Sequence, residues 1–170
     1  MERLIAANLH FLEQAGKLLA RLDDERYACP VASFYGSSVG GHIRHCLEHY
    51  CSLLAGVDSG KVDYDDRKRD HALESEAACA ITQVEETRRQ LAALAAGEAP
   101  VGLLVKMDCG GEEIEWQPST MGRELQFLVS HTVHHFAMIG GICRELGVDL
   151  EEGFGVAPST LRHQKALERS

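Results

Sequence analysis

The segment that decides the fold covers residues 128–147 and reads LVSHTVHHFAMIGGICRELG. Each residue turns an α-helix by about 100°, so Met138 and Ile142 fall within about 20° of His131 on one helical face. His135 lies on the same face, one turn after His131. The segment therefore predicts an amphipathic helix that carries two imidazoles on its apolar face.

Three further segments place apolar residues at helical spacing. Together with the helix just described, the predicted helices cover residues 2–22, 37–57, 70–96 and 119–146. Ser37 and Ser38 are both candidates for the N-cap of the second helix, and Gly147 follows the fourth helix where a C-terminal glycine is common. Helices of this length joined by loops most simply pack together, so we expect an all-α four-helix bundle.

Residues 103–117 depart from helical spacing and alternate like a β-strand around Gly110 and Gly111. A Gly-Gly pair suits a two-residue hairpin turn. The expected cross-strand pairs are Met107 with Ile114, Val105 with Trp116, and Lys106 with Glu115. We therefore predict a small β-hairpin between the third and fourth helices, packed beside the bundle.

The composition is that of one acidic domain. The chain has 170 residues, with 17 Lys and Arg against 26 Asp and Glu, which gives a formal net charge of −9. This length favours a single domain over residues 1–170, ending in a tail over residues 148–170 with one short helix after Pro158. The negative charge argues against nucleic acid or an anionic membrane surface as the main partner.

The sequence also bears on the cellular compartment. No apolar run approaches the roughly 20 residues that span a bilayer, and the first residues do not have the pattern of a signal peptide. None of the cysteines forms a CxxC pair, so we expect a cytoplasmic protein with reduced thiols. The cysteines concerned are Cys29, Cys46, Cys51, Cys79, Cys109 and Cys143.

Histidines gather in two clusters, one on the second predicted helix and one on the fourth. The clustered residues are His42, His45 and His49, followed by His131, His134 and His135. An HxxxH pair such as His131 and His135 brings two imidazoles to one cation from a single helical face. An unpaired buried polar group costs about 1–3 kcal/mol, and a divalent cation shared with a third imidazole would satisfy both rings. The pattern therefore predicts a metal site between the second and fourth helices.

Other metal-site patterns fit less well. Neither cluster contains the glutamate of the HExxH motif that marks zincin proteases. Paired ExxH motifs with further glutamates, which di-iron bundles use, are also missing, since Glu48 and Glu124 are the acidic residues near the clusters. We interpret His42, Glu48, His49 and His134 as neighbours of the ligands or as alternative ligands.

The segments SVGGHIRHCLEHY (residues 38–50) and LVSHTVHHFAMIGGICRELG (residues 128–147) resemble the DinB-like superfamily. This superfamily consists of metal-binding four-helix bundles and includes bacterial thiol-dependent S-transferases. The resemblance implies that His45, His131 and His135 bind a divalent metal, usually nickel or zinc. His42 is the alternative to His45 as the ligand from the second helix.

Three imidazoles leave at least one coordination position open to water or substrate. A thiol bound there would lose its proton more easily. The resemblance to the DinB-like superfamily, taken together with this open position, implies a metal-dependent enzyme that activates a low-molecular-weight thiol for transfer to a small electrophile. The alternatives are a non-catalytic metal-binding module of structural or stress-related function, and an empty site in a domain that has kept only the fold. The amphipathic helices and the hairpin also offer a face for a homodimer.

Overall fold

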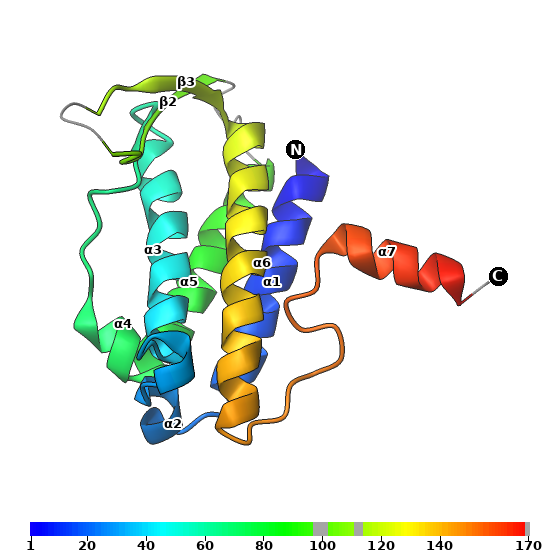
Figure 1. The fold of residues 1–170 in the computed structure, drawn as a ribbon. Coiled ribbons are helices and arrows are strands. Elements are labelled where there is room, and N and C mark those ends of the chain that lie inside the picture. Colours follow the sequence, from blue (N-terminus) through cyan, green and yellow to red (C-terminus); the bar gives the residue numbers. More distant parts are fainter. Residues whose placement is uncertain (97–101, 111–113, 169–170) are drawn as a thin grey trace.

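The computed structural model describes residues 1–96, 102–110 and 114–168. Long helices lie side by side, and a small sheet crosses one end of them (Figure 1). The helices are α1 (Glu2–Leu19), α2 (Asp24–Ala28), the 3₁₀ turn η1 (Ala32–Phe34), α3 (Val39–Gly56), α4 (His71–Ser75), α5 (Ala77–Ala96), α6 (Met121–Glu145) and α7 (Pro158–Leu167). The strands are β1 (Lys61–Asp63), β2 (Gly102–Lys106) and β3 (Gln117–Thr120).

The four long helices α1, α3, α5 and α6 form the bundle that the sequence predicts. Helix α1 packs against α5 and α6, and α3 packs against the same two helices. Apolar side chains from all four fill the core, among them Phe11, Tyr50, Leu91 and Phe136. The predicted mostly helical fold is therefore confirmed.

A polar network inside this core holds three helices in register. The Tyr50 hydroxyl donates to Asn8 Oδ1 (2.9 Å) and lies 3.2 Å from Thr132 Oγ1. Asn8 Nδ2 in turn donates to the Leu125 carbonyl at 3.0 Å. Because buried polar groups need partners, these contacts allow few relative positions of α1, α3 and α6.

Two predicted helices end differently from the expectation. The first, predicted to reach residue 22, ends at Leu19 and is followed by the separate helix α2. The third, predicted over residues 70–96, is interrupted at Glu76, whose backbone is extended (φ −121°, ψ 108°). The Asp24 carboxylate accepts from the Ala77 backbone N–H (2.8 Å) at the start of α5. A side chain from α2 thus caps the start of α5, and α4 is a separate short helix that packs against α3.

The sheet has the order β1-β2-β3, with β1 parallel to β2 and β2 antiparallel to β3. The antiparallel pairing of the predicted hairpin is present, but its register was wrong. Val105 pairs with Gln117 instead of Trp116. Part of the predicted turn, residues 111–113, lies outside the described residues.

The difference between the predicted and the observed register of β2 and β3 has a local cause at the start of α6. Strand β3 runs directly into α6, whose N-cap Thr120 accepts from the Arg123 N–H (3.1 Å). Trp116 lies before β3, and the ammonium groups of Lys61 and Lys106 lie 5.5 and 5.4 Å from its ring centroid. Strand β1, which lies between the second and third predicted helices where no strand was predicted, gives β2 a second neighbour and buries Val62.

The remaining expectations concern the tail, the thiols and membrane insertion. The short helix predicted after Pro158 is present as α7, which extends away from the bundle (Figure 1). The six cysteines are all free, as expected. Among the described helices, none combines the length and apolar character that crossing a membrane would require.

Candidate metal centre

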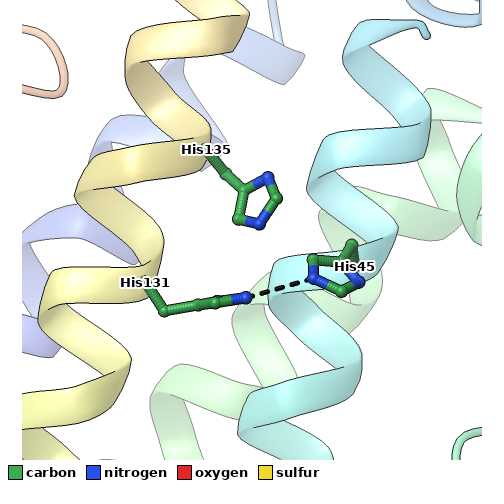
Figure 2. A group of neighbouring side chains, drawn as sticks. All are labelled: His45, His131 and His135. Atoms are coloured by element: carbon green, nitrogen blue, oxygen red, sulfur yellow. Dashed lines mark hydrogen bonds between the residues drawn. The ribbon is translucent and has the colours of Figure 1, made fainter. Parts of the chain in front are cut away.

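Three histidines from two neighbouring helices meet inside the bundle. His45 projects from α3 toward His131 and His135, which project from α6 (Figure 2). One ring nitrogen from each lies within 4.8 Å of the other two, and Nε2 of His131 is 3.1 Å from Nε2 of His45. Two nitrogens bound to one zinc ion at about 2.0–2.1 Å would lie about 3.3 Å apart in tetrahedral geometry. The separation between His45 and His131 is therefore close to that of a metal pair.

Hydrogen bonds on the outer nitrogens show which ring atoms face inward. Nδ1 of His135 lies 2.9 Å from Nδ1 of His42, and Nδ1 of His45 accepts from Arg67 Nη1 at 2.7 Å. Nδ1 of His131 is buried and has no partner among the described residues. In His45 and His135 the outer nitrogen is thus occupied, which leaves Nε2 of each ring toward the shared space.

The two helices that carry the triad begin at capped positions. Ser38 Oγ accepts from the Gly41 N–H at 3.0 Å and starts α3, as the sequence predicts for one of its two candidates. The contact between Tyr50 and Thr132 joins α3 to α6 next to the triad, because Thr132 follows His131 directly. The cap fixes where α3 begins, and the Tyr50–Thr132 contact restrains how α3 lies against α6, so both help to position the three imidazoles.

Burial keeps the three imidazoles neutral. It lowers the pKa of His45 to about 3 and that of His135 to about 4, and neighbouring imidazoles add to both effects. The pKa of His131 is lowered as well, first by burial and then by His49, His135 and His45. Neutral imidazole is the form that binds metal, so no proton competes with a cation for these rings at neutral pH.

His42 and His49 lie beside the triad without joining it. His42 links His135 to Ser37, because its Nε2 lies 3.2 Å from Ser37 Oγ while its Nδ1 faces His135. His49 is buried and donates from Nδ1 to the His45 carbonyl oxygen at 2.8 Å. Of the two candidate ligands on α3, His45 is therefore the one whose nitrogen lies near those of His131 and His135. His42 contacts His135 only from outside this group.

Glu48 and His134 are farther from the shared space. Glu48 Oε1 accepts from the Asp70 N–H at 3.1 Å, which directs it to the segment before α4. His134 contacts the edge of the His135 ring, with ring centroids 5.1 Å apart. Both residues neighbour the triad along their helices without contributing a nitrogen or oxygen to it.

Two further residues beside the triad carry no signal in the sequence. Arg67 approaches His45 from the segment between β1 and α4. Tyr64 stacks on His49 with ring centroids 5.5 Å apart, and its hydroxyl donates to Glu124 Oε2 at 2.8 Å. Both lie between the second and third predicted helices, where no helix or strand is predicted, so no local pattern marks them.

A cavity of about 390 Å³ opens beside the triad. His45 and His135 form part of its wall, together with His42 and Ser37, which contact each other. Arg44 and Glu74 line the same cavity and form an ion pair, with Nη1 2.9 Å from Oε2. A small molecule can therefore reach two of the three triad residues from this side.

A four-helix bundle with a histidine triad shared by two neighbouring helices defines the class of protein. Residues 2–139 match the family model described as the DinB superfamily. The chain belongs to the DinB superfamily, which confirms the resemblance of its two histidine segments to that family.

One similar protein comes from a fungus. The chain is 33% identical over 107 residues to FK506-binding protein 5 of Rhizopus delemar, a match that covers 61% of this chain and 28% of that protein. The chain thus spans less than a third of this relative. No solved structure matches the chain.

Proposed function

We propose that Nε2 of His45, His131 and His135 binds one divalent metal ion, with nickel and zinc as the first candidates. The observation that carries this proposal is the convergence of three neutral, inward-facing ring nitrogens within 4.8 Å. Nitrogen ligands alone do not select among nickel, zinc, copper and iron. Membership of the DinB superfamily supports the same ligand set.

We further propose that the protein is an enzyme that uses this site to activate a small thiol for transfer to an electrophile. Three protein ligands leave a position for substrate, and the cavity reaches His45 and His135. When bound there, a divalent cation lowers the pKa of a coordinated thiol and favours the nucleophilic thiolate. A small-molecule substrate also fits the net charge of −9 better than nucleic acid does.

The chain's own residues would orient this site through a short hydrogen-bonded series. With Nε2 of His135 as a ligand, its Nδ1–H donates to Nδ1 of His42, whose Nε2–H then faces Ser37 Oγ. Ser37 Oγ donates onward to the Phe34 carbonyl oxygen. The series fixes the tautomer and the ring orientation of His135, as partners of metal-binding histidines commonly do.

Arg67 favours the tautomer of His45 that does not suit metal binding at Nε2. A guanidinium can only donate, so its contact requires a free lone pair on Nδ1 and places the His45 proton on Nε2. Metal binding at Nε2 needs the other tautomer, with the proton on Nδ1. A cation held by Nε2 of His45 would therefore require Arg67 to give up this contact.

The experiment measures consumption of a small electrophile by the purified protein with a panel of thiols. The protein is first treated with a chelator and then supplied with nickel or zinc. We expect turnover that depends on both thiol and metal and that is lost in the His135→Ala variant. His134→Ala serves as the control, because it removes a neighbouring imidazole of the same helix. Stoichiometric metal without turnover would contradict the enzymatic proposal and favour a structural role that ties α3 to α6.

A further inference from the structure

Two opposite charges face the cavity beside the triad. Arg44 on α3 and Glu74 on α4 are joined by an ion pair of 2.9 Å, and their side chains are 23% and 37% exposed. His45 and His135 line the same space. A molecule that reaches the open coordination position would therefore lie beside one cationic and one anionic group.

The fold holds this pair in place through a close approach of two helices. A Cβ atom on Gly40 would lie 1.9 Å from the Glu74 carbonyl oxygen, so only glycine lets α4 pack this closely on α3. From the other side, the Tyr27 hydroxyl donates to the Leu73 carbonyl at 2.6 Å. Glu74 is thus set beside the first turns of α3, where Arg44 can reach it.

The pair keeps capacity for further partners. Arg44 uses Nη1 and Glu74 uses Oε2 for their contact, whereas a guanidinium has five N–H donors and a carboxylate has two oxygens. A Cβ atom on Gly41 would lie 3.6 Å from Glu74 Oε1, so the absence of a side chain leaves space next to this oxygen. Arg44 can therefore bind a carboxylate while Glu74 binds an ammonium group.

We infer that the cavity binds a thiol that carries a free α-carboxylate and a free α-ammonium group, that is, an amino-acid thiol of the cysteine type. This inference rests on the proposed metal-dependent function and names its thiol substrate. The carboxylate would lie on Arg44, the ammonium group on Glu74 and the sulfur at the open position of the triad. A cavity of about 390 Å³ is within the usual range for small-ligand sites.

Three contact points, on Arg44, on Glu74 and at the triad, would also make the site selective for one enantiomer of the thiol. In cysteine the carboxylate, the ammonium group and the sulfur-bearing carbon are all attached to one chiral carbon. A site that binds all three groups fits one enantiomer better than its mirror image. Metal chelation by cysteine alone would not distinguish the enantiomers, so stereoselectivity reports recognition by the protein.

The test uses titration calorimetry on the zinc-loaded protein, with zinc content measured before and after. The probes are L-cysteine, D-cysteine, cysteamine, which lacks the carboxylate, and 3-mercaptopropionate, which lacks the ammonium group. We expect one cysteine enantiomer to bind at least about tenfold more tightly than each of the other three, a difference of about 1.4 kcal/mol. Arg44→Gln should remove the preference over cysteamine, and Glu74→Gln should remove the preference over 3-mercaptopropionate.

The matched controls are Arg88→Gln and Glu85→Gln on α5. Arg88 Nη1 and Glu85 Oε1 form an ion pair of the same 2.9 Å length, and neither residue lines this cavity. Both control variants should keep the wild-type preference. Gly41→Ala adds one methyl group beside Glu74 Oε1 and should weaken cysteine binding at unchanged zinc content.

The possible outcomes separate the two proposals. Equal binding of all four thiols, or a preference that survives in Arg44→Gln and Glu74→Gln, would overturn the amino-acid thiol and leave the metal-dependent function standing. If no thiol binds to the zinc-loaded protein, both proposals fail. L-serine is a fifth probe, which lacks the thiol; if it binds as tightly as L-cysteine, the sulfur is not recognised and the thiol function fails.

Discussion

At the scale of single residues, the site depends on what each histidine does with its outer ring nitrogen. His131 and His135 can be selected from the sequence, because an HxxxH pair on an apolar helical face places two imidazoles where one cation can satisfy both. The choice between His42 and His45 could not be made that way, since both lie on one flank of the same helix. Only the packing of α3 on α6 places Nε2 of His45 at 3.1 Å from His131.

His42 provides the first residue-scale prediction. In the proposed site the Nδ1–H of His135 donates to His42, so His42→Phe should lower metal affinity about 10–100-fold, the usual cost of losing such a partner. Competition with a chromogenic chelator measures this affinity. The control His134→Ala should change it less than about threefold. A His42→Phe variant with wild-type affinity would show that His135 needs no such support.

Arg67 provides the second residue-scale prediction, in which the substitution raises metal affinity instead of lowering it. Its contact stabilises the tautomer of His45 that cannot bind metal at Nε2, and its charge repels a cation nearby. Arg67→Met should therefore raise metal affinity, by about three- to tenfold on the scale of 1.4 kcal/mol per factor of ten. Lys68→Met removes one positive charge from the next residue and is the control. Weaker metal binding in Arg67→Met would mean that Arg67 supports the site.

At the scale of helices and strands, periodicity predicts the bundle well and the connections poorly. Apolar spacing identifies the four long helices because each buries one continuous face. The predicted sheet register was wrong, because β3 and the α6 N-cap determine the pairing, whereas a Gly-Gly turn alone does not. Arg67 and Glu74 were missed for a related reason, since their places depend on how the segment between β1 and α5 packs on α3.

The packing of α4 on α3 yields a prediction with a matched pair of variants. Gly40→Ala would force its new Cβ into the Glu74 carbonyl oxygen and should lower the free energy of unfolding by about 1–3 kcal/mol. Gly41→Ala meets nothing closer than 3.4 Å, so we expect no loss and a gain of up to about 1 kcal/mol from helix propensity. Urea denaturation measures both. Equal stability of the two variants would contradict the close approach.

At the scale of the whole molecule, stability and the proposed metal binding depend on the same buried imidazoles. The bundle holds His45, His131 and His135 neutral at a pH where the same residues in an unfolded chain would begin to bind protons. The stability of the folded chain is therefore linked to the protonation of this site, and a cation that binds only the folded state would add to that stability.

This coupling predicts the pH dependence of the metal-free protein. The pKa of His45 is lowered to about 3 and that of His135 to about 4, below the ordinary value of about 6.5. Between these values the unfolded chain binds more protons than the folded one, so stability falls as the pH falls. We expect a loss of at least about 1 kcal/mol between pH 7 and pH 5 in urea denaturation of chelator-treated protein. A flat profile would contradict the burial of neutral imidazoles.

The central claim, a metal ion held between α3 and α6, is tested most directly by elemental analysis of untagged protein together with its His131→Ala variant. After saturation with zinc or nickel and removal of loosely bound ions, we expect about one ion per wild-type chain. The variant should retain almost none, because it loses the ligand that faces His45 directly. A wild-type chain without metal, or a variant that binds as much as wild type, would contradict the claim.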